Sequence, residues 1–171
     1  LNDRMRETYR HQEEERIDAD LKERLMDALI ARNDIEVPQS LVGKQMEYLV
    51  ERTRERMARQ RLSLEMMGLD EEKLKERFEP EAIRQVKGMI LLDAVGRAEG
   101  ITASEEEVDA RITEVTAVGG AQQAEVAERY RQDRKLRDNL AMQLRDEKVM
   151  TFLKEKATIR EVEPKEQPAS R

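Results

Sequence analysis

Carboxylates are the most abundant side chains here that could do chemistry, and two runs of three stand out, Glu13–Glu15 and Glu105–Glu107. Paired carboxylates can act as general acid and base, but adjacent acids in a polar run usually form a solvated helix face or stabilise a first helical turn. A serine nucleophile would need a histidine base, and the single histidine, His11, lies in the polar stretch YRHQEEE. There are no cysteines for a disulfide or a thiolate metal site. We therefore predict no catalytic residues, no metal and no other cofactor.

The sequence also argues against nucleotides, nucleic acids and membranes as direct partners. It contains neither G-x-x-x-x-G-K-[ST] nor G-x-G-x-x-G, the usual phosphate-binding loops. The net charge is −6, and the arginines of RTRERMARQR (52–61) are expected to scatter around a helix, with no aromatic residues between them. The longest apolar run, GMILLDAVG, is interrupted by Asp93 and is far shorter than the ~20 residues of a membrane span. Together with the absence of cysteine, this favours a cytoplasmic protein.

One apolar stretch is unusual in a chain that is 41% charged and 3% aromatic. RLSLEMMGLD (61–70) places four large apolar side chains within six positions. If the preceding helix continues through residue 67, two of them extend its apolar face and two project from the other side. The last helix shows a similar doubling, with Leu136, Leu140, Leu144 and Phe152 in one row and Met142, Val149 and Leu153 in another.

Such two-sided helices either pack between two neighbours or expose an apolar surface, and the sequence leaves both explanations open. Exposed apolar area usually marks an interaction surface, and methionine suits contact with many partners because it is flexible and polarizable. On the second explanation, the candidate substrate-binding residues are Leu62, Leu64, Met66, Met67, Val118, Met142, Val149 and Leu153.

Helical periodicity and helix end signals run through nearly the whole chain, so we predict an all-α fold. Apolar residues spaced from Ile17 to Leu29 indicate a first helix, and a second should begin at Pro38. Asp70 is a candidate N-cap, and Pro80 should start a further helix that runs to Gly100. With so few aromatic residues the core must be thin, which favours an elongated, open shape.

The second half of the chain begins with a capping-box pattern in two registers, Thr102 with Glu105 or Ser104 with Glu107. Gly119–Gly120 should break the helix that follows. A short helix comes next, and the last one should span residues 135–157. TIREVEP could then be extended, and KEQPASR should be a frayed tail.

Three stretches resemble, in the family's order, the C-terminal substrate-holding domain of bacterial trigger factor, the ribosome-associated chaperone. They are LMDALIARNDIEVPQSLV, LKERFEPEAIRQVKGMILLDAVGRAEGITASEEEVDARI and YRQDRKLRDNLAMQLRDEKVMTFLKEKATIREVE. The resemblance covers residues 20 to 162 and implies two helical arms around an open cleft. The expected organisation within one domain is a linker helix (1–33), a first arm (34–100), a second arm (101–134), a closing helix (135–158) and an extended segment with the tail (159–171).

The resemblance implies an ATP-independent chaperone that holds unfolded or nascent polypeptides and assists protein folding and export in its parent protein. The family's ribosome-docking loop and prolyl-isomerase domain have no counterpart here, so we expect a C-terminal domain that begins in the linker helix, is not an enzyme, and meets the ribosome only through the parent. Weak homodimerisation remains open. The alternatives are a periplasmic chaperone of outer-membrane proteins with a related helical core, and an inert helical dimerisation scaffold.

Overall fold

The computed structural model of the chain describes residues 2–68, 70–117 and 120–157. Within these residues all regular structure is helical, as predicted. The helices are α1 (Asn2–Arg32), α2 (Gln39–Arg59), the short 3₁₀ helix η1 (Glu65–Met67), α3 (Glu71–Ala98), α4 (Glu105–Thr116), α5 (Gly120–Gln132) and α6 (Arg134–Lys156). The predicted extended segment and tail, and Val118, lie outside the described residues.

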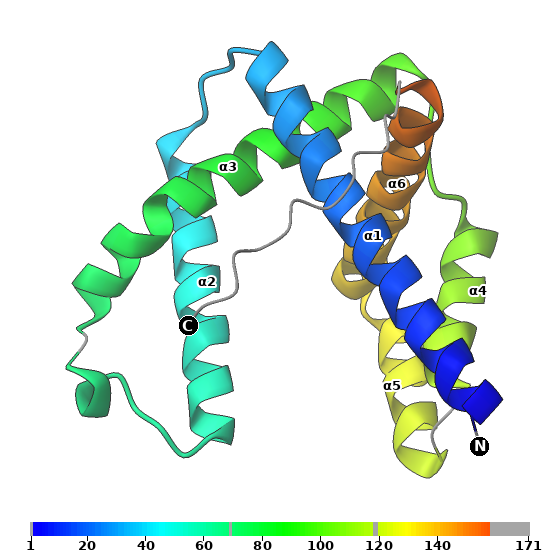
Figure 1. Ribbon diagram of the computed structural model, residues 1–171, viewed down its shortest axis with the longest axis horizontal. Coiled ribbons are helices and arrows are strands. Elements are labelled where there is room, and N and C mark those ends of the chain that lie inside the picture. The colour runs from blue at the N-terminus through cyan, green and yellow to red at the C-terminus, as the bar shows by residue number, and fades with distance from the viewer. Residues whose placement is uncertain (1, 69, 118–119, 158–171) are drawn as a thin grey trace.

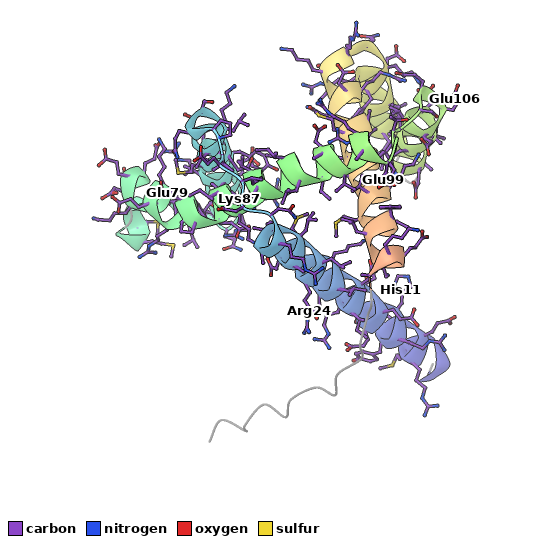
Figure 2. All side chains as sticks on the ribbon, turned by 90° about the horizontal axis from the view of Figure 1, so that it is seen from above. His11, Arg24, Glu79, Lys87, Glu99 and Glu106 are labelled. Carbon is purple, nitrogen blue, oxygen red and sulfur yellow. The ribbon has the colours of Figure 1, made fainter. Side chains whose placement is uncertain are left out.

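Two arms diverge from α3, which runs the length of one side of the molecule (Figure 1). The first arm is α2 packed along α3, and the second consists of α4, α5 and α6 packed on one another. Figure 2 shows Glu79, Lys87 and Glu99 in succession along α3 as it passes from one arm to the other. Within the described chain α2 makes no contact with the second arm. The elongated architecture with two arms, which the family resemblance implied, is therefore confirmed; the second arm as defined here includes α6, which was expected as a separate closing helix.

Each arm has a small apolar core of its own. In the first arm Val42 of α2 packs with Ala82 and Val86 of α3, and all three are fully buried. The core of the second arm contains Val108, Ile112, Ala127, Leu140 and Leu144. Because neither cluster contains more than five buried residues, each arm has only a small interior.

The long helix α1 packs on α3 and α6. Met26 lies over Gly88 of α3, where an added Cβ would come 2.9 Å from the methionine Sδ. The guanidinium of Arg84 donates to Asp27 at 2.9 Å, and Lys154 of α6 pairs with Asp18. The predicted apolar face holds from Leu21 onwards, but Ile17 is 57% exposed because the first half of α1, with His11, projects beyond these contacts (Figure 2).

The sequence prediction for Pro80 is wrong, because α3 begins at Glu71, capped by Asp70 as predicted, and continues through the proline. A proline inside a helix removes one hydrogen bond and costs ~3 kcal/mol. Here α3 packs along α2 and buries Leu74 before the proline and Ala82 after it. The continuous packing outweighs the local cost.

The capping box of α4 uses the second of the two predicted registers. The Glu107 N–H donates to Ser104 Oγ at 3.2 Å, and the Ser104 N–H donates to the Glu107 carboxylate at 2.7 Å. The carboxylate also accepts from the ammonium of Lys148 on α6, 2.8 Å away. Hydrogen bonds from Lys148, and then from the Ser104 backbone, lower the pKa of Glu107. Glu107 thus completes the N-terminal cap of α4 and also bonds this helix to α6.

Replacing the capping serine, Ser104→Ala, should lower the free energy of unfolding by about 1 kcal/mol and the thermal midpoint by roughly 2–4 °C. The matched control is Thr102→Ala, because the Thr102 hydroxyl takes no part in the cap and only its backbone carbonyl is bonded, to Lys148. Thermal unfolding followed by circular dichroism measures both variants. Equal losses would mean that the register is wrong.

Candidate functional site

An apolar surface, here called the tip patch, lies at the far end of the first arm, in the connection between α2 and α3. It consists of Leu62, Leu64, Met66 and Met67. Met66 and Met67 are 71% and 57% exposed, Leu62 is 39% exposed and Leu64 is half-buried. The helix that could have continued through residue 67 ends at Arg59, and η1 follows as a short separate turn that ends at Gly68. The four side chains therefore stand on a loop and a single 3₁₀ turn.

A Schellman motif ends α2 and directs the chain into this loop. The Leu62 N–H donates to the Met57 carbonyl at 2.9 Å, and the Arg61 N–H donates to Ala58 at 3.0 Å. Arg61 has a φ of 56°, the left-handed conformation usually taken by glycine at this position. After η1 the chain turns again at Gly68, whose φ is 64°. Two left-handed residues thus define the loop that presents the methionines.

The substitution Arg61→Gly should raise the free energy of unfolding by about 0.5–1 kcal/mol, because a left-handed residue with a Cβ costs more than the added freedom of glycine in the unfolded chain. Gln60→Gly provides the contrast, since Gln60 has a φ of −92° and gains no such relief. Urea unfolding should therefore show a higher free energy of unfolding for Arg61→Gly and a lower one for Gln60→Gly. A loss in both variants would argue against the left-handed turn.

The base of the loop is fixed by charge. Arg54 of α2 pairs with Glu71 at the start of α3, and Lys75 pairs with the same carboxylate at 2.8 Å. Hydrogen bonds from Lys75 and then Arg54 lower the pKa of Glu71. Beside these groups is a hollow of about 540 Å³, here called the tip hollow, lined by Arg54, Met57, Leu62, Ser63, Leu64, Glu65, Asp70 and Glu71. Part of the tip patch therefore borders a concave surface.

A second concave surface, the junction hollow, is lined by side chains of α1, α2, α3 and α6. Its volume is about 640 Å³. Its apolar side chains are Met26, Met89, Leu92 and Met150, and its polar ones are Lys22, Glu23, Asp27, Glu81 and Arg84 together with Gln45 and Gln85. Met89 is 46% exposed. Such a mixture of apolar and charged side chains suits an apolar ligand group whose neighbours stay in water.

Met26, Met89 and Met150 were not among the residues predicted from sequence. Met89 begins the run MILLDAV, which surrounds most of the circumference of a helix with apolar groups and so predicts burial on several sides. The sequence does not show that α2, α1 and α6 pack against different parts of α3. Met89 lies between those parts and stays partly exposed. The abundance of methionine, nine residues in all, was the available signal.

The structure separates the remaining predicted residues. Met142 is 48% exposed on α6, and Leu153 is half-buried near its end. Val149 is fully buried, so its predicted place on an exposed surface is wrong. It packs against α3 at Gly96, where an added Cβ would be 3.4 Å from the valine Cγ2. The tip patch is thus the only predicted group of adjacent residues whose exposure the described structure supports.

The different burial of Val149 and Met142, two turns apart on α6, can be measured directly. Val149→Ala should reduce the free energy of unfolding by roughly 2 kcal/mol, because it leaves a void between α3 and α6. Met142→Ala should change it by less than about 0.5 kcal/mol, as is usual for exposed positions. Chemical denaturation of the two variants tests this difference, and a large loss for Met142→Ala would contradict the exposure of that side chain.

The chemical groups at these surfaces suit contact with another molecule. Among the described residues no group of three or more histidine, aspartate or glutamate side chains could hold a metal ion. A search of the same residues finds no helix with the length and apolar character needed to cross a bilayer. What the two surfaces offer is exposed methionine and leucine, bordered by charge.

Comparisons with known proteins agree with the fold and with the family resemblance. Residues 1–155 match the family described as the C-terminus of bacterial trigger factor protein. The chain is 42% identical over 166 residues to the trigger factor of Geotalea daltonii, and the alignment covers 97% of this chain and 38% of that protein. For the trigger factor of Geobacter sulfurreducens the identity is 41% over 161 residues, which cover 94% of this chain and 37% of that protein.

A solved structure of trigger factor domains from Thermotoga maritima has the same fold. Its TM-score is 0.58 at 20% sequence identity, over 79% of this chain and 80% of that one. The present chain spans only about 38% of the length of the curated relatives described above. The matched family covers nearly all of the chain, which therefore belongs to the bacterial trigger factor family and corresponds to its C-terminal region.

Proposed function

We propose that this chain is a chaperone domain that holds unfolded or nascent polypeptides on exposed apolar patches without using ATP. The exposure of Met66 and Met67 at the end of an arm is the observation that carries the proposal. Membership of the trigger factor family supports it. The junction hollow, with its three methionines, is the second proposed patch.

The expected strength of one patch is modest. At ~25 cal/mol per Å², covering about 300 Å² of apolar surface contributes at most about 7 kcal/mol. Ordering the bound segment and losing its translational freedom offset much of this. Each patch should therefore bind weakly and release readily. Two patches on one scaffold can still retain a long chain, because the second contact forms within one complex.

In a full-length trigger factor, this holding would assist the folding and export of chains that leave the ribosome. We assign ribosome docking and prolyl isomerisation to other regions of such a protein, and no catalytic residue to this chain. The charged residues around both patches would keep the exposed methionines from driving self-association.

The double substitution Met66→Ser/Met67→Ser should weaken binding of an unfolded polypeptide about tenfold, because two largely exposed methionines would no longer be covered by the client. Light scattering of a chemically denatured protein diluted into buffer with the chain measures the holding activity. Fluorescence anisotropy of a labelled unfolded peptide gives the affinity.

The matched control is Met5→Ser/Val115→Ser, which removes two side chains, each 51% exposed, from α1 and α4, outside both patches. It should retain full activity. If both double variants bind equally well, the tip patch does not hold clients. A tight dimer in sedimentation that buries the tip patch would favour the inert scaffold instead.

A further inference from the structure

A third concave surface lies on the first arm between α2 and α3, and we call it the arginine groove. Its volume is about 360 Å³, and it is lined by Leu49, Arg52, Thr53, Glu55, Arg56, Arg59 and Phe78. Leu49 and Phe78 are half-buried and supply the groove's large apolar side chains. The groove shares none of its residues with the tip hollow or the junction hollow.

The arginines of this helix are not scattered as the sequence analysis expected. Arg52, Arg56 and Arg59 follow the i, i+4, i+7 spacing and line one groove. Arg54 lies on the other flank of α2, where it pairs with Glu71, and Arg61 lies in the turn beyond the helix. The prediction overlooked that three of the five share one face.

These three arginines are not neutralised within the described part of the chain. None of them forms an ion pair there, whereas most of the other described arginines do. The guanidinium of Arg52 lies over the Tyr48 ring, 5.7 Å from its centroid, a cation–π contact that orients it. With three arginines and one glutamate, the groove has a net charge of +2 in a chain whose overall charge is −6.

The end of the helix explains only part of this arrangement. Arg56 and Arg59 lie in the last turn of α2, where cations offset the helix dipole. Arg52 lies about two turns from the end, beyond the range of that effect, and yet lines the same groove. The tip hollow provides a contrast, since its one arginine and three carboxylates give a net charge of −2.

We propose that the arginine groove binds acidic segments of unfolded polypeptides, a proposal that rests on the holding function above and adds a preference to it. A large apolar side chain of the client contacts Leu49 and Phe78, and flanking carboxylates accept hydrogen bonds from the guanidinium groups of Arg52, Arg56 and Arg59. The planar guanidinium matches a carboxylate in geometry and donates two bonds to it.

A polypeptide fits this groove better than a nucleic acid does. Arg52 covers the Tyr48 ring, so the ring is not free to stack on a base. Glu55 also lines the groove, and it would repel a continuous run of phosphates. Carboxylates spaced along a peptide can avoid it.

The test uses the whole chain and three labelled peptides with the same Leu-Phe-Leu centre, flanked by aspartate, by serine or by lysine. We expect the aspartate-flanked peptide to bind about tenfold more tightly than the serine-flanked one at low salt, since three exposed charge contacts of ordinary strength combine to that factor. The preference should shrink as ionic strength rises. Equal affinity for all three peptides would overturn the proposal.

The variant Arg52→Gln/Arg56→Gln/Arg59→Gln should lose the preference and keep the affinity for the serine-flanked peptide. The charge-matched control is Arg6→Gln/Arg32→Gln/Arg129→Gln, which removes exposed arginines from α1 and α5 and should keep the preference. An equal loss of the preference for the aspartate-flanked peptide in both variants would assign the effect to net charge and overturn the proposal. An unchanged circular dichroism spectrum shows that each variant is folded. If a variant does not fold, the comparison of the three peptides on the unaltered chain still tests the proposal.

Two other occupants of the groove, a nucleic acid and a second copy of the chain, are tested by two further measurements. Competition by a short single-stranded RNA at lower concentration than the acidic peptide would make nucleic acid the ligand and overturn the proposal. So would self-association that only the groove variant abolishes, because the occupant would then be a second copy of the chain. If aggregation suppression persists without any charge preference, the groove proposal fails alone. If no unfolded polypeptide binds at all, the proposed function fails first.

Discussion

The close approach of α3 and α6 at Gly96 is the contact on which the rest of the structure depends. Gly96 has no side chain, which leaves room for Val149 and for the aliphatic part of the Arg145 side chain. A Cβ added at Gly96 would lie 3.4 Å from both. Beside it the Arg145 guanidinium pairs with Asp93 at 2.6 Å. Because α3 belongs to the core of one arm and α6 to the core of the other, this junction sets how the arms diverge. The helix α1 braces it by packing on both.

Ion pairs orient the helices of the second arm more than they stabilise it. Arg137 of α6 pairs with Glu105 and Asp109 of α4, and Arg111 of α4 pairs with Glu147 of α6. Exposed pairs of this kind contribute about 0–1 kcal/mol each. The free energy of folding must come mainly from the small apolar core, while the charges select one alignment of the helices and hold water around the apolar surfaces.

Local sequence signals predicted local structure well and packing poorly. Asp70 was identified as a cap, and Ser104 as one of two candidates, because such side chains act within a few residues. The helical spacing of Val42, Val50 and Met57 likewise indicates one apolar face, and the structure buries all three. Pro80 and Val149 were misjudged because their surroundings come from helices far away in sequence. No periodicity shows that α6 crosses α3 at a glycine. The family resemblance, rather than the pattern of residues, supplied the two arms.

If the proposed surfaces hold clients, their separation would itself be selective. The tip patch and the arginine groove lie on the first arm, and the junction hollow is lined by α1, α3 and α6 together with Gln45 of α2. A folded protein presents a convex, largely polar surface and could cover only one of them. An unfolded chain exposes apolar side chains at intervals and can bend between surfaces, so weak contacts add within one complex. On the proposed function, a folding client would withdraw those side chains, the contacts would be lost one at a time, and release would need no energy source beyond the folding of the client.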